Sequence, residues 1–196
     1  MIEYLIGKVT ELNPTYCVLE ASGVGYFLNI SLLFYESLQN VSGESLCKIY
    51  VQEIIREDSH DLYGFKDKSE RESFRMLIGV SGVGPNTARL ILSSLSPDQL
   101  ESAISSGNEI PLKSVKGIGG KTAQRIIVDL KDKIKRGVTS LNLSVPVSGA
   151  TFNDAAAALV MLGFSMQQSQ KALTKVFAED ASLTTEQAIK RALKLL

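Results

Sequence analysis

A short glycine motif occurs twice in the chain and constrains its fold more than any other feature. Gly82-Val83-Gly84 and Gly117-Ile118-Gly119 lie 35 residues apart. An apolar pattern of helical spacing precedes each copy, and another follows it. Glycine permits the positive φ angle of a tight turn, and Pro85 suits the first position of a helix. The repeat therefore predicts two helical hairpins in tandem.

The start of the second helix in each hairpin is a candidate anion site. The first N–H groups of a helix have no partner within it and lie at the positive end of the helix dipole. A phosphate oxygen fits such a place. Two hairpins capped by glycine for packing alone remain the alternative.

Two other glycine-rich phosphate motifs do not fit these residues. A P-loop would need glycine at position 115, where the sequence has Val115, and no predicted strand precedes Gly120-Lys121-Thr122. A dinucleotide fingerprint would need a third glycine where Thr87 and Thr122 stand. The spacing of the glycines therefore favours a tandem helical hairpin over both of these motifs.

Charge is distributed unevenly along a chain that is neutral overall, with 21 basic and 21 acidic residues. Residues 1–62 hold three basic and nine acidic groups, whereas residues 63–136 hold thirteen and eight. Residues 137–196 are nearly balanced, with five and four. The basic middle segment suggests a local site for a polyanion, although a solvated helical face would also be rich in lysine.

The sequence of the acidic first segment, residues 1–62, predicts a small β-barrel. Runs of β-forming residues predict five short strands, at residues 4–9, 17–20, 26–30, 46–51 and 54–56. Turn residues separate the first of these strands. Five strands in about 60 residues favour an OB-type barrel. Its negative charge disfavours the electrostatic groove by which such barrels bind single strands.

The remaining sequence predicts a linker and a small helical domain. Residues 137–150 carry no charge and are rich in Ser, Val and Gly, which is typical of a flexible connector. Three helices follow, near residues 153–162, 167–178 and 186–195. Ser165 and Thr184 each precede a glutamine by three residues, as in a capping box. The expected fold is α+β and multi-domain: barrel 1–62, hairpins 63–136, linker 137–150 and a three-helix, UBA-like domain 151–196.

Cysteine and histidine are too few for a metal centre. The chain has Cys17, Cys47 and His60 only, so a zinc site lacks ligands and free thiols are expected. We find no apolar stretch of transmembrane length and no signal-peptide pattern. These features predict a cytoplasmic protein without cofactor.

The motifs together resemble the RuvA family of bacterial Holliday junction-binding subunits. The resemblance spans the whole chain. Its most specific parts are the opening Met-Ile, GVGY at residues 23–26, REDSHDLYGF at 56–65, both hairpins, and IVDLKD at 127–132. Asn86 and Gly120 depart from the pattern, because family members commonly carry lysine there; Lys116 or Arg89 are candidates to compensate.

The resemblance implies a homotetramer, one or two per junction, that holds a four-way DNA junction open during recombination and repair, including the SOS response to damage. It implies DNA contacts, independent of sequence, through Ser81, Gly82, Val83, Gly84, Asn86, Gly117, Ile118, Gly119, Gly120, Lys121, Thr122 and Arg125. Glu57 and Asp58 would form an acidic pin that repels the strands at the crossover. Residues 151–196 would dock on a RuvB-type hexameric ATPase, which alone uses ATP. A junction-resolving nuclease is a further possible partner.

Two other functions are kept open. In the first, Glu57, Asp58 and Asp61 hold a divalent metal and the chain is a hairpin nuclease. In the second, the barrel is a general single-strand binder, which its acidity opposes. With one histidine and no P-loop, catalysis by this chain alone is not expected.

Overall fold

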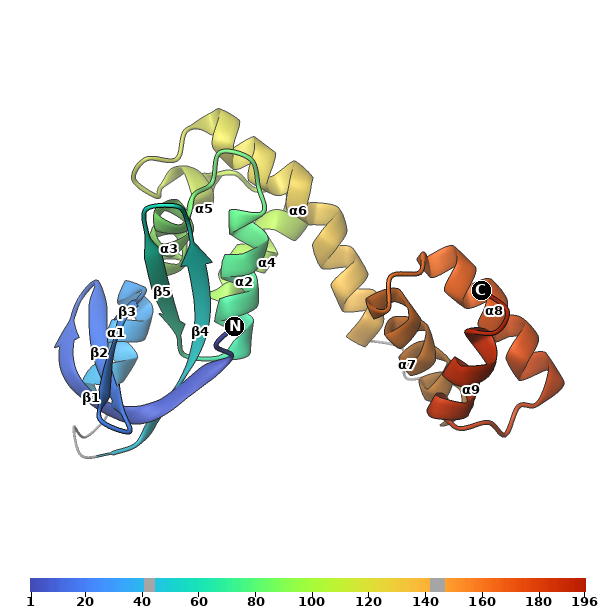
Figure 1. The fold of residues 1–196 in the computed structure, drawn as a ribbon. Helices are drawn as coiled ribbons and strands as arrows, with labels where there is room; N and C mark the ends of the chain where they lie inside the picture. The colour runs from blue at the N-terminus through green and yellow to red at the C-terminus, as the bar shows by residue number, and fades with distance from the viewer. Residues whose placement is uncertain (41–44, 142–146) are drawn as a thin grey trace. The chain divides into compact units, whose positions relative to one another are not determined.

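The computed structural model describes residues 1–40, 45–141 and 147–196, and only the backbone of residues 135–141 and 147–150. The chain forms two compact units, Met1–Val138 and Thr139–Leu196. In Figure 1 the first unit combines a barrel with helices, whereas the second is built from helices. The expected α+β architecture is confirmed.

The barrel is closed by five strands in the order β1-β2-β3-β5-β4. Their bounds are β1 (Tyr4–Asn13), β2 (Tyr16–Ala21), β3 (Val24–Asn29), β4 (Cys47–Ile55) and β5 (His60–Phe65). Alternate side chains point inward, and Leu19, Leu28 and Ile49 are fully buried. The barrel that the sequence predicts is therefore present.

The last two predicted strands were wrong in detail. The predicted strands 46–51 and 54–56 both fall on a single strand, β4 (Cys47–Ile55), apart from one residue at each end. The fifth strand is instead β5, which ends beyond the expected boundary at residue 62. The predicted strands left out Gln52 and Glu53, which are polar, but both residues pair with β5 in the ladder. Glu53 Oε2 also accepts from the Ile2 N–H at 3.0 Å. The partnered carboxylate makes a polar residue compatible with a continuous strand.

A helix that the sequence analysis did not predict follows β3. It is α1 (Leu32–Gln39), and the Ser31 side chain caps it by accepting from the Phe34 N–H at 3.1 Å. Phe34 and Leu38 are buried in the barrel core. The helix therefore belongs to the barrel, and its core includes more than strand residues.

In the described part of the chain, five helices follow β5 in the first unit, and the last of them runs past Val138, where that unit ends. They are α2 (Lys68–Ile78), α3 (Pro85–Ser94), α4 (Pro97–Ser106), α5 (Ile110–Lys113) and α6 (Gly120–Leu141). Their common core also contains Tyr63 and Phe65 of β5, whose rings lie 5.0 and 4.9 Å from that of Phe74. Because β5 contributes to the helical core, barrel and hairpins form one packed body.

Polar contacts reinforce this junction between barrel and helices. The Arg71 guanidinium is buried and donates to Glu3 Oε1 at 2.6 Å, and the Leu32 N–H donates to Ser93 Oγ at 3.0 Å. The charge of Arg71 is therefore paired inside the fold and is not offered to a ligand.

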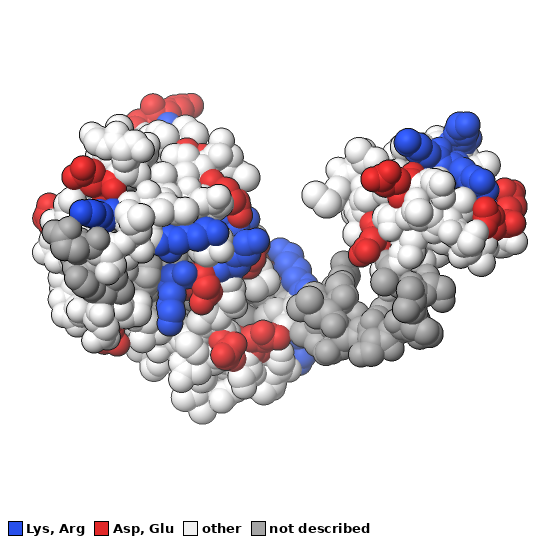
Figure 2. Space-filling view, turned by 90° about the horizontal axis from the view of Figure 1, so that it is seen from below, with Lys and Arg blue, Asp and Glu red and all other residues white. Residues whose placement is uncertain are grey.

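Figure 2 shows the first unit from the side opposite the hairpin turns, where basic and acidic side chains are interspersed.

The second unit packs three helices around a small core. They are α7 (Val147–Met161), α8 (Met166–Glu179) and α9 (Thr185–Ala192). Both predicted capping boxes are present, at Ser165 and Thr184. Of the expected linker, residues 137–141 and 147–150 lie in α6 and α7, and residues 142–146 lie outside the described residues. Within the described chain, no helix is long and apolar enough to cross a membrane.

Candidate nucleic-acid interface

The two glycine motifs form turns of the same backbone geometry. Gly82 has φ of 88° and Gly117 has φ of 90°, a region that side chains rarely adopt. A buried valine precedes each turn, Val80 in the first and Val115 in the second. Gly84 then caps α3, and Gly119 immediately precedes α6. The repeat in sequence is thus a repeat in structure.

The apolar residue between the glycines anchors each turn to the core. Val83 is 5% exposed and Ile118 is 6% exposed. The Val83 N–H donates to the Val80 carbonyl at 3.0 Å, and the Ile118 N–H to that of Val115 at 3.1 Å. These two amides already have partners, so the expectation that they donate to phosphate needs correction. Their role is to shape the turn.

The neighbouring amides are differently placed. Within the described residues, no protein hydrogen bond is found for the N–H groups of Gly82, Gly84, Asn86 and Thr87, or of Gly117, Gly119, Gly120, Lys121 and Thr122. The first helical bonds are made only by Ala88 and Ala123, to the Gly84 and Gly119 carbonyls. Each hairpin therefore presents a group of free donors at the positive end of a helix dipole.

Charged side chains gather at the second hairpin and reach the first. A hollow of about 210 Å³ is lined by Ser81, Gly82, Lys121, Thr122 and Arg125. Arg125 Nη1 lies 3.3 Å from the Ser81 carbonyl oxygen, to which it donates. Arg125 therefore bridges α6 and the first turn. The structure brings these five predicted residues together around one space.

The first hairpin has fewer cations of its own. Asn86 is exposed, and its Oδ1 makes a long, 3.5 Å contact with the Tyr63 hydroxyl. Arg89, a candidate to compensate for the missing lysine, donates to the Thr15 carbonyl at 2.8 Å. Arg89 therefore ties α3 to the β1–β2 turn. Lys116 is exposed beside Gly117, where it remains a candidate.

The predicted acidic pin lies at the tip of a tight turn. Glu57 and Asp58 are exposed between β4 and β5, and the Arg56 N–H closes the turn by donating to the Ser59 carbonyl at 2.8 Å. In Figure 1 this turn and both hairpin turns lie toward the upper side of the first unit. Negative side chains and free amides thus share one side of the unit.

No arrangement suited to a metal ion accompanies the pin. Across residues 1–40, 45–141 and 147–196, no group of three or more His, Cys, Asp or Glu side chains could hold a metal. Glu57, Asp58 and Asp61, the expected ligands of the nuclease alternative, do not form such a group.

Cys17 is buried in the barrel core, and burial raises the pKa of its thiol to about 12.

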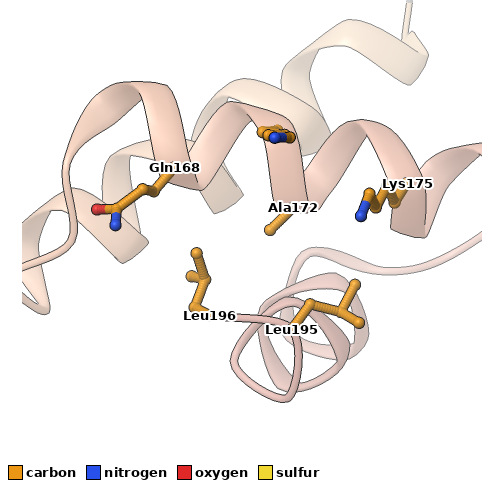
Figure 3. A pocket seen from close by; sticks show the side chains of 6 residues that line it. Gln168, Ala172, Lys175, Leu195 and Leu196 are labelled. Carbon is orange, nitrogen blue, oxygen red and sulfur yellow. The ribbon is translucent and has the colours of Figure 1, made fainter.

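The second unit has a separate, partly apolar surface. Met161 is 90% exposed and Leu162 is 61% exposed, at the turn between α7 and α8. Elsewhere a hollow of about 230 Å³ lies against α8. Figure 3 shows Lys175 along this helix, with Leu195 and Leu196 across the hollow. Met161 and Leu162, which adjoin in the sequence, are candidates for contact with a partner.

A closed five-stranded barrel joined to two matched hairpins defines the class of tandem helix-hairpin-helix proteins, and residues 74–132 match the SAM-like helix-hairpin-helix tandem family. Residues 1–64 match the RuvA N terminal domain, and residues 150–196 match the RuvA C-terminal domain. The chain belongs to the RuvA family.

Relatives match this chain over its whole length. The Holliday junction branch migration complex subunit RuvA of Bacteroides fragilis is 50% identical over 204 residues, covering 100% of both chains. The protein of the same name from Parabacteroides distasonis is 52% identical over 200 residues, and that of Porphyromonas gingivalis is 48% identical over 205, each again with 100% of both chains covered.

Proposed function

We propose that this chain binds four-way DNA junctions as the non-catalytic subunit of a branch migration complex that acts in recombination and repair. Its relatives carry the name of that subunit. The observation that carries the proposal is the pair of matched turns, each with free amides at a helix start, in one body with an exposed acidic turn.

Recognition follows from what these groups can contact. Backbone amides, Lys121, Arg125 and the Thr122 hydroxyl bind phosphate oxygens, which are the same in every sequence. Because binding releases counterions, affinity falls steeply as salt rises. Specificity then comes from the shape of the junction rather than from its bases.

The acidic turn acts where the strands cross. One chain supplies one pair of hairpins and one such turn, so four copies with fourfold symmetry match the four arms of a junction. Glu57 and Asp58 stand at the centre and repel nearby phosphates, which keeps the exchanging strands apart. Either one tetramer or two, one on each face of the junction, satisfies this arrangement.

The second unit recruits the motor. Its exposed Met161 and Leu162 offer an apolar contact for a RuvB-type hexameric ATPase. ATP is bound and hydrolysed by that partner, and this chain needs no cofactor. A junction-resolving nuclease is a further partner of the complex, and the protein acts in the cytoplasm.

A competition experiment tests junction binding. A labelled four-way junction is challenged with unlabelled junction, linear duplex and single strand of the same sequences, at two salt concentrations. We expect only the junction to compete efficiently and the affinity to fall at higher salt. Equal competition by duplex would show a general DNA grip and contradict the proposal. Preference for single strands would instead favour the barrel as the binding site.

The same assay tests the pin with the variant Glu57→Gln/Asp58→Asn. Removing two negative charges per subunit weakens repulsion, so we expect tighter binding to the junction and little change with duplex. Glu36→Gln, an exposed substitution on α1, is the control. Unchanged junction affinity in the pin variant would contradict the repulsive role. Strand cleavage on addition of magnesium would support the nuclease alternative.

A further inference from the structure

A lysine ammonium lies beside the first residue of α6, although that residue is glycine. Lys113 extends from α5 toward Gly120. A Cβ atom on Gly120 would lie 3.4 Å from Lys113 Cε and 3.7 Å from Lys113 Nζ. A side chain at residue 120 would therefore point toward the space that the Lys113 ammonium occupies.

Glu109 holds this ammonium in place. Its Oε2 lies 2.5 Å from Lys113 Nζ, one helical turn along the chain. The Lys113 ammonium is the main cause that lowers the pKa of the Glu109 carboxyl group, and the Gln124 amide is the second. Residues 120 and 124 share a face of α6. Glu109 thus holds the ammonium beside the face of α6 that carries Gly120.

The ammonium remains accessible in this position. The Lys113 side chain is 46% exposed. An ammonium has three N–H donors, and the bond to Glu109 uses one. The free amides of Gly120 and Lys121 begin α6 next to it. A phosphate bound by these amides would lie within reach of the lysine.

We propose that Lys113 supplies the cation at the start of the second hairpin helix and contacts a DNA phosphate there, in place of a lysine at residue 120. The inference rests on the proposed junction binding, because it assigns a residue to that site. With Lys121 and Arg125, it gives the second hairpin three cations. Glu109 is a positioning residue that orients Lys113 in the free protein.

The competing account is structural. The Glu109–Lys113 ion pair could serve only to hold α5 against α6, in which case its loss would lower stability without altering the charge seen by DNA. Salt dependence separates the two accounts, because each cation that neutralises a phosphate adds about 0.9 to the slope of log affinity against log salt. A structural role leaves that slope unchanged.

The experiment compares junction affinity over a salt series for four proteins. They are the wild type, Lys113→Met, Lys113→Met/Gly120→Lys, and the control Lys190→Met, an exposed lysine of α9. Methionine keeps the length of the chain without its charge. Thermal unfolding followed by circular dichroism shows that each variant is folded.

We expect Lys113→Met to bind several-fold more weakly, with a slope reduced by about one unit for each subunit in contact. The double variant restores the slope, because it returns the charge to the same space from residue 120. Lys190→Met behaves as the wild type.

A wild-type slope in Lys113→Met would overturn the inference while leaving junction binding intact. Weaker binding that the double variant does not rescue, at an unchanged slope, would show the structural role and also overturn it. Failure of the wild type to prefer junction over duplex is a different result, since it contradicts the proposed function itself.

Discussion

The two hairpins share one backbone geometry but differ in the charge of the side chains at their helix starts. At equivalent positions the first has Pro85, Asn86 and Leu90, whereas the second has Gly120, Lys121 and Arg125. Proline lacks the N–H that Gly120 offers, and Asn86 and Leu90 carry no charge. The turn itself needs only a glycine of positive φ and a buried apolar residue. The fold therefore constrains the turn and leaves its charge free to differ.

The two hairpins also differ in the contacts that they make with the rest of the first unit. The first hairpin is attached to the barrel through the Arg89 bond to the Thr15 carbonyl and the Leu32 bond to Ser93. The second hairpin instead extends a cation, Arg125, toward Ser81 of the first. We conclude that the first hairpin is mainly an anchor that offers amides, while the second carries most of the charge.

The largest effect is expected where the hairpins are alike, in their buried residues. Ile118→Ala should lower the free energy of unfolding by about 3 kcal/mol, because it leaves a cavity in the core. Val83→Ala should have a similar but smaller effect. Tyrosine fluorescence in a urea titration reports on the first unit alone, since all six tyrosines precede residue 64 and there is no tryptophan.

Ile110→Ala is the matched control for this prediction, because Ile110 is 75% exposed. Its unfolding curve should coincide with that of the wild type. Equal stability of Ile118→Ala and Ile110→Ala would show that the turn is not anchored as described.

A smaller effect is expected from making the hairpins more alike in charge. Asn86→Lys places a cation beside the free amides of the first helix, where Asn86 is already exposed. Junction affinity should rise about fivefold, with a salt slope steeper by about one unit per subunit in contact. Gel-shift titrations over a salt series measure both. An unchanged slope would mean that this position does not face phosphate.

The smallest effect concerns the pH response of Glu109, which has no equivalent in the first hairpin. The bond from Lys113 is the main cause that lowers its pKa below the ordinary 4.5. A lowered pKa in the folded state stabilises the fold above pH 4.5, and this contribution is lost as pH falls through the lowered value.

Lys113→Met should raise the pKa of Glu109 toward its ordinary value. The carboxyl carbon resonance of labelled glutamate, followed in a pH titration, reports this change. Glu179→Gln, an exposed substitution on α8, is the control and should leave the titration of Glu109 unaltered. A pKa of Glu109 that is the same with and without Lys113 would contradict the geometry of the pair.

Much of this architecture could be predicted from local sequence. The repeat located both turns, and the glutamines after Ser165 and Thr184 located helix starts, because each is a signal within a few residues. The same capping box at Ser96 marks α4, a helix that the sequence analysis did not single out.

The parts that failed depend on contacts between distant residues. The β4–β5 pairing makes Gln52 and Glu53 strand residues, which their polarity alone did not indicate. Similarly, Lys113 reaches α6 from another helix, so spacing along the chain gave no hint of it. The Val83 and Ile118 amides are a local exception, because each already donates within its own turn, to the carbonyl three residues earlier.

The most direct test of the account compares equivalent substitutions in the two hairpins. Junction affinity is measured over a salt series for Lys121→Met and Asn86→Met. We predict that Lys121→Met binds about tenfold more weakly with a shallower salt slope, whereas Asn86→Met keeps the wild-type slope. Equal losses and equal slopes in the two variants would contradict the division into an anchoring hairpin and a charged one.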